Sequence, residues 1–326
     1  MSWPKRRSLS MPDRNGIMLV DKPAGMTSHD VVNYLRRKLD TRRIGHTGIL
    51  DPNATGLLVM LLGRGTLLSS LLIGMTKRYA ARFEFGMATD TYDADGQVVT
   101  QSDPGDFSRD KFEALLNDYR GEIEQNIPPF SAAKRNGKTF HKLARKGKSF
   151  NPGIKVVEVT GLKVIDYAWP EVALDISCSS GTYIRSLAHQ MGAVIGCGGY
   201  LKALRRLEVG AFRLSEASTL EEIIKSSSIE QYIRPLKEAL PNCPMLRIKE
   251  EYLGAVIGGR PLAKKYFTEG DYGGGGGELS LLLDEDEKVL ALAQLNMNWR
   301  SLEKLGPTQI MGTYVRVIDE GHLRAD

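Results

Sequence analysis

The spacing of hydrophobic positions predicts a mixed order of strands and helices along the chain. Residues 16–20 form a short apolar run that ends in a turn rich in Asp, Pro and Gly, which predicts a buried strand. A helix is expected next, because Thr27 or Ser28 can cap it and its apolar positions recur at helical spacing. These positions are Val31, Tyr34, Leu35 and Leu39. Residues 77–85 alternate polar and apolar side chains, which is typical of a strand with one buried face.

The pattern continues with an amphipathic helix at 107–120, strands at 154–168 and 171–178, and a helix from about 182 to 194. Near the C-terminus the strand-like runs are short, at 279–283, 289–293 and 313–318. Neighbouring strands look like hairpins, and clear βαβ crossovers are few. We therefore predict an α+β fold with a large, mainly antiparallel mixed sheet flanked by helices, followed by a small β-rich C-terminal domain.

The domain organisation follows from changes in composition. Residues 1–15 are predicted to be a flexible basic tail, and 16–242 to form the large domain. The boundary is placed in the proline-rich segment 235–244, so that 243–326 form the smaller domain. A strongly basic segment at about 128–152 is expected to be an insertion in the large domain.

Composition and charge narrow the class of protein only moderately. Of 326 residues, 42% are hydrophobic and 25% are charged, and the net charge is +5, which fits a globular chain and does not by itself imply nucleic acid. The three cysteines are far apart and form no CxxC pair, which suits a reducing compartment. No apolar run is long enough for a membrane span and no signal peptide is present, so we expect a cytoplasmic protein.

Common cofactor signatures are missing from the sequence. There is no GxxxxGK[ST] phosphate loop, no GxGxxG after a strand and no GxSxG turn. The five histidines form no HxxxH or HExxH pair. We therefore expect neither a metal nor a nucleotide cofactor.

The most informative segment is the loop 45–56, GHTGILDPNATG, in which Asp51 precedes a proline. An Asp at such a place often only satisfies local backbone donors in a turn. Here the loop is long, contains three glycines, carries His46 five residues before the Asp, and joins two apolar segments. Loops held by a rigid core often carry functional residues. From these features alone, the structural and functional interpretations of Asp51 stay equally open.

Six motifs in order resemble those of the bacterial tRNA pseudouridine synthases of the TruB family. The loop 45–58 is similar to GHTGxLDPxATGxL, and Ile49 and Asn53 are minor departures from the usual residues. The other matches are DKPAGMTS at 21–28, KRY at 77–79, TDTYDADG at 89–96, SGTYIRSL at 180–187, and GCGG at 196–199 with LRRL at 204–207. Together they cover roughly residues 16–215.

The resemblance implies a pseudouridine synthase fold, a PUA-like C-terminal module, and isomerisation of uridine 55 in the T-loop of tRNA. It assigns the catalytic carboxylate to Asp51, its ion-pair partner to Arg185 and an active-site tyrosine to Tyr79. The implied substrate contacts are His46, Tyr183, Leu204 and Lys22. Plain core packing remains the alternative for Tyr183 and Leu204, and a satisfied loop histidine for His46.

The segment 131–150 contains seven basic residues and no Asp or Glu, with aromatic residues between them. It resembles the family's mobile RNA-clamping insertion, although most charge runs are only solvated helix faces. The predicted RNA-binding residues are Lys134, Arg135, Lys138, Lys142, Arg145, Lys146 and Lys148. We expect the partner to be the T-loop and T-stem of tRNA, bound by a monomer.

Other functions remain to be distinguished. A tRNA-binding or folding chaperone without catalysis would use the same basic segment but would not need Asp51, Tyr79 and Arg185 together. A glycoside hydrolase would need a second carboxylate, for which Asp93 in the acidic loop 90–95 is the candidate. An enzyme guided by a separate RNA is a further alternative.

Overall fold

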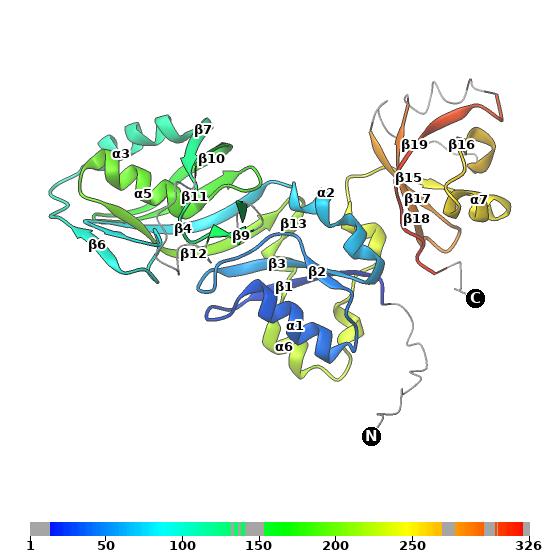
Figure 1. Cartoon of the computed structure of the whole chain (residues 1–326), viewed down its shortest axis with the longest axis horizontal. Coiled ribbons are helices and arrows are strands. Elements are labelled where there is room, and N and C mark those ends of the chain that lie inside the picture. Colours follow the sequence, from blue (N-terminus) through cyan, green and yellow to red (C-terminus); the bar gives the residue numbers. More distant parts are fainter. Residues whose placement is uncertain are drawn as a thin grey trace.

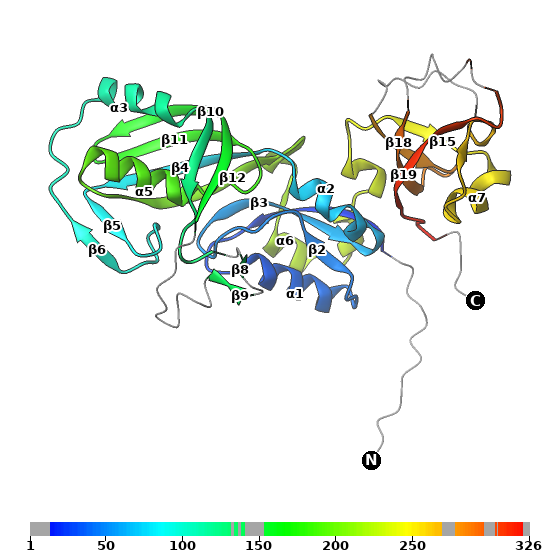
Figure 2. The same cartoon turned by 45° about the horizontal axis from the view of Figure 1, so that its top comes forward.

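The computed structural model describes residues 14–131, 134–135, 138–140, 153–268, 278–296, 304 and 306–321, and the side chains of 134–139 are not described. Figure 1 shows a large sheet with helices on it and a smaller C-terminal sheet at one end of the molecule. In both views the small sheet lies at the opposite end from the hairpin of β5 (Met87–Thr89) and β6 (Val98–Gln101) (Figures 1 and 2).

The large sheet has ten strands, most of them antiparallel to their neighbours. Across the sheet they are β14 (Ser218–Thr219), β1 (Gly16–Lys22), β3 (Thr55–Leu62), β12 (Gly199–Val209), β4 (Lys77–Phe85), β11 (Glu171–Cys178), β10 (Ile154–Ala168) and β7 (Gly121–Asn126), with β2 (Ile44–His46) beside β3 and β13 (Phe212–Arg213) beside β12. Only β1–β14 and β12–β3 pair in parallel. The predicted antiparallel mixed sheet is confirmed.

The continuous apolar run of β3 is explained by burial on both faces. Its even-numbered residues from Leu58 to Leu62 pack on α1 (Ser28–Lys38) and α6 (Leu220–Lys225). Its odd-numbered residues from Leu57 to Leu61 face a second core with η1 (Gly63–Leu68) and α2 (Ser69–Ile73). Side chains alternate between the faces of a strand, so a strand covered on both sides needs apolar residues at every position.

The other half of the sheet is covered on one face by α3 (Arg109–Leu115), η2 (Leu116–Tyr119) and α5 (Ile184–Ile195) (Figure 1). Phe83 and Phe112 lie fully buried in this core, and Leu187 of α5 packs there too. Along β11, buried residues on one face alternate with half-buried residues on the other, as expected of a strand with one covered face. This packing fixes α5, whose first turn carries Arg185, against the sheet.

The C-terminal sheet runs β15 (Met245–Arg247), β17 (Leu279–Leu283), β18 (Val289–Leu295), β19 (Ile310–Val317) and β16 (Leu262–Ala263), with α7 (Leu253–Ile257) against it. Leu281, Leu283 and Val289 share one apolar core with β1 and β3 of the large sheet. The expected boundary segment also joins this core, since η5 (Leu236–Ala239) is buried. The proline-rich segment in which the domain boundary was placed is therefore packed at its centre.

Several local predictions can be compared with the structure. Thr27 caps α1 in a capping box with Asp30, and the strands at 154–168 and 171–178 are present with those bounds. At the end of the predicted tail, Arg14 pairs with Glu230 at 2.6 Å. Strand β12 was not predicted at all. Most of the basic insertion, including 141–152, lies outside the described residues, apart from the short hairpin β8 (Lys134–Arg135) and β9 (Lys138–Thr139).

The shared core predicts that the two sheets unfold together. Leu283→Ala removes a side chain that is 3% exposed and lies between the sheets. We expect the free energy of unfolding to fall by about 2–5 kcal/mol with a single transition in urea. A separate transition of the C-terminal sheet, with the large sheet unaffected, would contradict this expectation.

Candidate active site

The loop between β2 and β3 is held by its own backbone and by the neighbouring turn. Thr47 donates its N–H to Val59 O at 3.1 Å, and Ala54 donates to Asp51 O at 3.1 Å. Gly25, in the turn after β1, donates to Pro52 O at 3.1 Å. The loop therefore has a defined course on the edge of the core, although it contains no regular secondary structure.

Three buried side chains lie beneath this loop and bind its carbonyl groups. Arg206 is 1% exposed and donates to Leu57 O at 2.7 Å, to Ile49 O at 3.3 Å and to Gly48 O at 3.2 Å. Ser28 donates to Leu50 O at 3.2 Å and accepts from Leu50 N at 2.8 Å. Gly56 must be glycine, because a Cβ there would lie 2.3 Å from Arg206 O.

Lys22 is the third of these side chains, and its ammonium group binds backbone carbonyls on both sides of the site. Its ammonium donates to Pro23 O at 2.9 Å, Met26 O at 2.7 Å and Pro52 O at 3.0 Å, and the residue is fully buried. All three donors of the ammonium group are thus used by backbone carbonyls, and a substrate contact of Lys22 stays a prediction. It ties the turn after β1 to the residue that follows Asp51.

Asp51 and Arg185 form the predicted ion pair. Nε of Arg185 lies 3.0 Å from Oδ2 of Asp51, and Nη2 donates to Oδ1 at 3.4 Å, so both oxygens are engaged. The Arg185 side chain is 7% exposed and that of Asp51 is 38% exposed. Such two-point contact fixes the plane of the carboxylate and leaves one side open to a ligand.

The remaining donors of Arg185 are also occupied. Nη1 donates to Thr91 O at 3.0 Å and to Oδ2 of Asp93 at 3.1 Å, while Nη2 donates to Phe130 O at 3.1 Å. The acidic loop thus reaches the site through Asp93, which the sequence offered only as the second carboxylate of a hydrolase and not as a partner of Arg185. The guanidinium is held from three directions and has little freedom to move.

The charges around Asp51 oppose one another. Burial raises the pKa of Asp51 above its usual range, the Arg185 guanidinium lowers it, and the carboxylates of Asp93 and Asp95 raise it further. Lys22 lowers the pKa of Asp51 without touching it. Burial in turn lowers the pKa of Lys22 to about 8, against the attraction of Asp51. Arg185 and Lys22 are therefore the groups that favour the ionised carboxylate.

Tyr79 and Leu204 lie on the neighbouring strands β4 and β12. Tyr79 is 8% exposed and belongs to the same apolar cluster as Leu50 and Ala54 of the loop, and Leu204 packs against that cluster. Burial raises the pKa of Tyr79, and the charge of Asp51 raises it too, so its phenol stays protonated at neutral pH. An aromatic ring and an aliphatic side chain thus flank the loop that carries Asp51.

His46 and Tyr183 lie at the margins of the site. Gly48 N donates to Nδ1 of His46 at 3.2 Å, and burial lowers the pKa of His46, so the neutral imidazole carries its proton on Nε2. Tyr183 caps α5, and its backbone is held by the fully buried amide of Gln125 through bonds of 2.9 and 3.1 Å. Both side chains are half-buried.

The predicted RNA-binding residues cannot be placed in detail. Lys134 and Arg135 lie on β8 and Lys138 on β9, but their side chains are not described. Four others lie outside the described residues: Lys142, Arg145, Lys146 and Lys148. Their role stays a prediction.

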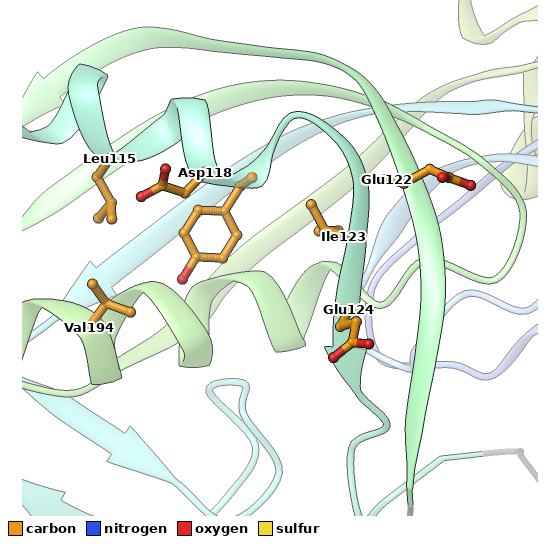
Figure 3. A pocket seen from close by; sticks show the side chains of 7 residues that line it. Leu115, Asp118, Glu122, Ile123, Glu124 and Val194 are labelled. Carbon is orange, nitrogen blue, oxygen red and sulfur yellow. The ribbon is translucent and has the colours of Figure 1, made fainter.

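A separate pocket of about 370 Å³ lies between η2, β7 and the end of α5 (Figure 3). Its rim carries the carboxylates of Asp118, Glu122 and Glu124. Val194, at its edge, lies nine residues along α5 from Arg185, or about 13 Å. Three carboxylates would repel a phosphate backbone, so this pocket is not a nucleic-acid site.

The described residues contain neither a cluster of metal ligands nor a membrane-spanning helix. No three His, Cys, Asp or Glu side chains gather there as a metal ion would require. No helix in that part of the chain is long and apolar enough to span a membrane.

Sequence reasoning missed the residues that position the site. Arg206, Ser28 and Gln125 act through hydrogen bonds to backbone groups distant in sequence, and Asp93, considered from sequence only as the second carboxylate of a hydrolase, binds Arg185. Arg206, Ser28 and Asp93 lie inside matched motifs, which was the one available signal. Nothing in the sequence marked Gln125.

Comparison with known proteins supports the resemblance. The model of the TruB family pseudouridylate synthase N-terminal domain matches residues 36–184, and that of the tRNA pseudouridylate synthase B C-terminal domain matches 185–241. The chain is 40% identical over 286 residues to tRNA pseudouridine synthase B of Aquifex aeolicus, covering 86% of this chain and 96% of the relative. It is 39% identical over 284 residues to that of Mycobacteroides abscessus, covering 86% and 92%.

Solved structures share the fold over nearly the whole chain. A chain of a Cbf5-Nop10-Gar1 complex aligns with a TM-score of 0.71 and 25% identity, covering 97% of this chain and 88% of that one. A chain of an H/ACA RNP bound to a substrate RNA containing 2'-deoxyuridine aligns with a TM-score of 0.72 and 23% identity, covering 94% and 86%. The predicted fold class is confirmed.

The electrostatics of the loop predict a pH effect for any reaction that needs the ionised Asp51. Because the pKa of Asp51 is raised, kcat/KM should fall on acidification at a pH above the ordinary range of an aspartate. Lys22→Met removes a charge that lowers this pKa, so the acid limb should move to higher pH.

Lys77→Met is the matched control for this pH effect. Lys77 is also buried, and its pKa is also lowered to about 8, but it is not among the charges that act on Asp51. Its replacement should leave the acid limb in place. An equal displacement of the limb in both variants would refute the role given to Lys22.

Proposed function

Because the chain belongs to the TruB family of tRNA pseudouridine synthases, we propose that it isomerises uridine 55 in the T-loop of tRNA to pseudouridine. The observation that carries the proposal is the two-point ion pair between Asp51 and the nearly buried Arg185. This pair lies in the two motifs that the resemblance links to catalysis.

The reaction conserves every atom of the nucleotide. The N1–C1′ bond of uridine breaks, the uracil turns, and C5 bonds to C1′, after which the proton on C5 leaves and N1 gains one. No oxidant, reductant or energy source is consumed, so the acid–base and nucleophilic groups of protein side chains are sufficient for the chemistry. An ionised carboxylate can start this sequence as a nucleophile at C1′ or as a proton acceptor. Both routes require Asp51 to be charged and fixed in orientation.

We assign Arg185 the task of keeping Asp51 charged and oriented. The closing of an active site over a base expels water and favours protonation of a carboxylate. A guanidinium bound to both oxygens opposes that change and prevents rotation of the carboxyl group. Asp93 and the carbonyl of Thr91 hold the guanidinium from its other side.

The target base must leave the stacked loop of the RNA to reach Asp51. Extrusion costs a few kcal/mol, and stacking on an aromatic ring can return about 1–3 kcal/mol. We propose that Tyr79 provides this ring and Leu204 an apolar wall, since both flank the loop of Asp51. His46, neutral and at the margin of the site, is proposed to occupy the space left by the extruded base.

A binding protein without catalysis explains the site less well. Arg185 is 7% exposed and its donors are committed to four protein groups, so it is poorly placed to bind phosphate. Pure RNA binding gives no reason to pair it with a half-buried carboxylate. The ion pair therefore favours an enzyme over a chaperone.

A two-carboxylate hydrolase is a closer alternative, because Asp51 and Asp93 share one guanidinium. Asp93 is nevertheless fully engaged: its Oδ1 accepts from Thr91 Oγ1 at 2.5 Å and from Asp95 N at 3.1 Å, and its Oδ2 accepts from Arg185. Three protein donors thus already use its oxygens, which suits Asp93 to holding Arg185 better than to donating a proton to a leaving group. The geometry thus favours a single catalytic carboxylate.

We propose tRNA as the partner, bound through the T-loop and T-stem. The basic insertion and the PUA-like C-terminal sheet are the proposed surfaces for its backbone. A guide RNA is not invoked, since identity is higher to the tRNA pseudouridine synthases B than to the chains of H/ACA complexes. We propose that the protein acts as a monomer in the cytoplasm.

The central test replaces Asp51 with Asn, which has the same shape but no charge. Tritium release from tRNA labelled at C5 of uridine should be abolished, while the Kd for tRNA stays within about threefold, because the carboxylate is not needed for backbone contacts. Wild-type protein with a transcript carrying cytidine at position 55 is the control and should release nothing. Release by Asp51→Asn at the wild-type rate would exclude the mechanism.

Arg185→Ala tests the ion pair. Loss of the buried guanidinium should lower kcat on the order of a hundredfold or more and change the Kd for tRNA far less. Arg82→Ala is the matched control, because Arg82 is 52% exposed in its pair with Glu171 and should alter neither quantity. Near-equal losses of activity and affinity in Arg185→Ala would argue for a binding role.

A further inference from the structure

We propose that Tyr92 and His189 together position Asp93, and through it Arg185, for the reaction. The inference rests on the proposed function for its kinetic readout. Tyr92 lies between the two residues of the acidic loop that bind Arg185, namely Thr91 and Asp93. Whatever fixes Tyr92 therefore fixes both acceptors of Nη1.

The rings of Tyr92 and His189 are stacked. Their centroids are 3.7 Å apart and their planes are inclined by only 11°. His189 follows Arg185 by four residues on α5, so both side chains leave the same face of the helix. Helix α5 thus contacts the acidic loop at two points one turn apart, by ion pairing and by stacking.

The backbone of Tyr92 adopts an unfavourable conformation that the stack can help to stabilise. Its φ is +65°, in the left-handed region that a residue with a bulky side chain rarely adopts. In this conformation Tyr92 O accepts from Leu201 N at 3.0 Å, and Ala94 N donates to Leu201 O at 3.1 Å. Such strain persists only where the surroundings compensate for it. The stacking of the Tyr92 ring on His189 is a contact that can compensate for this strain.

His189 is suited to stacking more than to hydrogen bonding. Its Nδ1 is buried and has no hydrogen-bond partner within the described part of the chain. Burial lowers its pKa, so the ring is neutral at neutral pH. Neither residue touches Asp51 in the contacts described above, so both are positioning residues.

The ring and the backbone can be separated by substitution at Tyr92. Tyr92→Phe keeps the ring and should leave kcat within twofold. Tyr92→Ala removes the ring and retains the strain, and should lower kcat about tenfold with the KM and Kd for tRNA unchanged. Tyr92→Gly also lacks the ring but tolerates the left-handed backbone, so it should recover part of the kcat lost in Tyr92→Ala. His189→Ala should match Tyr92→Ala, and the double variant should be no worse than either.

Trp169→Ala controls for a merely structural effect. Trp169 stacks on Phe85 with centroids 5.0 Å apart, six residues along β4 from Tyr79. Its loss should lower Tm and leave kcat unchanged. The proposal is overturned if Tyr92→Ala behaves in this way, if Tyr92→Phe loses as much kcat as Tyr92→Ala, or if Tyr92→Gly is no better than Tyr92→Ala.

A spectroscopic readout keeps the inference separate from the proposed function. The Nε–H of Arg185, observed by ¹⁵N NMR, should shift and exchange faster with water in Tyr92→Ala and not in Trp169→Ala. If wild-type protein forms no pseudouridine in tRNA, the proposed function fails while this coupling is still measurable. An Arg185 signal that is unchanged in Tyr92→Ala would refute the positioning role.

Discussion

The position of Asp51 depends on hydrogen bonds to the carbonyl groups of the loop that carries it. Lys22, Ser28 and Arg206 lie beneath the loop and bind the carbonyls of Gly48, Ile49, Leu50, Pro52 and Leu57. A buried carbonyl without a partner is costly, so these donors favour one conformation of the loop. The carboxylate is thereby presented from a segment that is fixed without being helix or strand.

Two of these donors are cations, and their burial has an electrostatic consequence. A buried ammonium is stable only when it is well hydrogen-bonded, and the lowered pKa of Lys22 reflects the cost of its desolvation. A neutral donor would hold the same carbonyls with less desolvation. It would not favour the ionised form of Asp51, as Lys22 does. The loop therefore gains orientation and charge balance from the same side chain.

The sequence predicted those helices and strands in which buried positions recur at a regular spacing along the chain. Strands β10 and β11 were found from alternation, and α1 from its cap and apolar spacing. Strand β12 was missed because its Leu, Ala, Lys and Arg residues favour helix, while pairing with β3 and β4 imposes extension. The hydrogen bonds of Lys22 were not predicted for a similar reason: Pro52 O, one of its acceptors, is 30 residues away. The pair of Asp51 and Arg185, 134 residues apart, was predicted only through the family resemblance.

Strand β12 connects the loop that carries Asp51 with the acidic loop that carries Asp93. Arg206, near one end, holds the loop of Asp51 and pairs in register with Tyr79 on β4. Leu201, near the other end, binds the backbone on both sides of Asp93, the second acceptor of Arg185. The register of β12 against β4 shifts close to both residues, and such irregularities change the direction in which side chains of the strand point. The separation of the two carboxylates that share the guanidinium is thus set by one strand, so that a shift of its register would uncouple Asp51 from Arg185 without altering either residue.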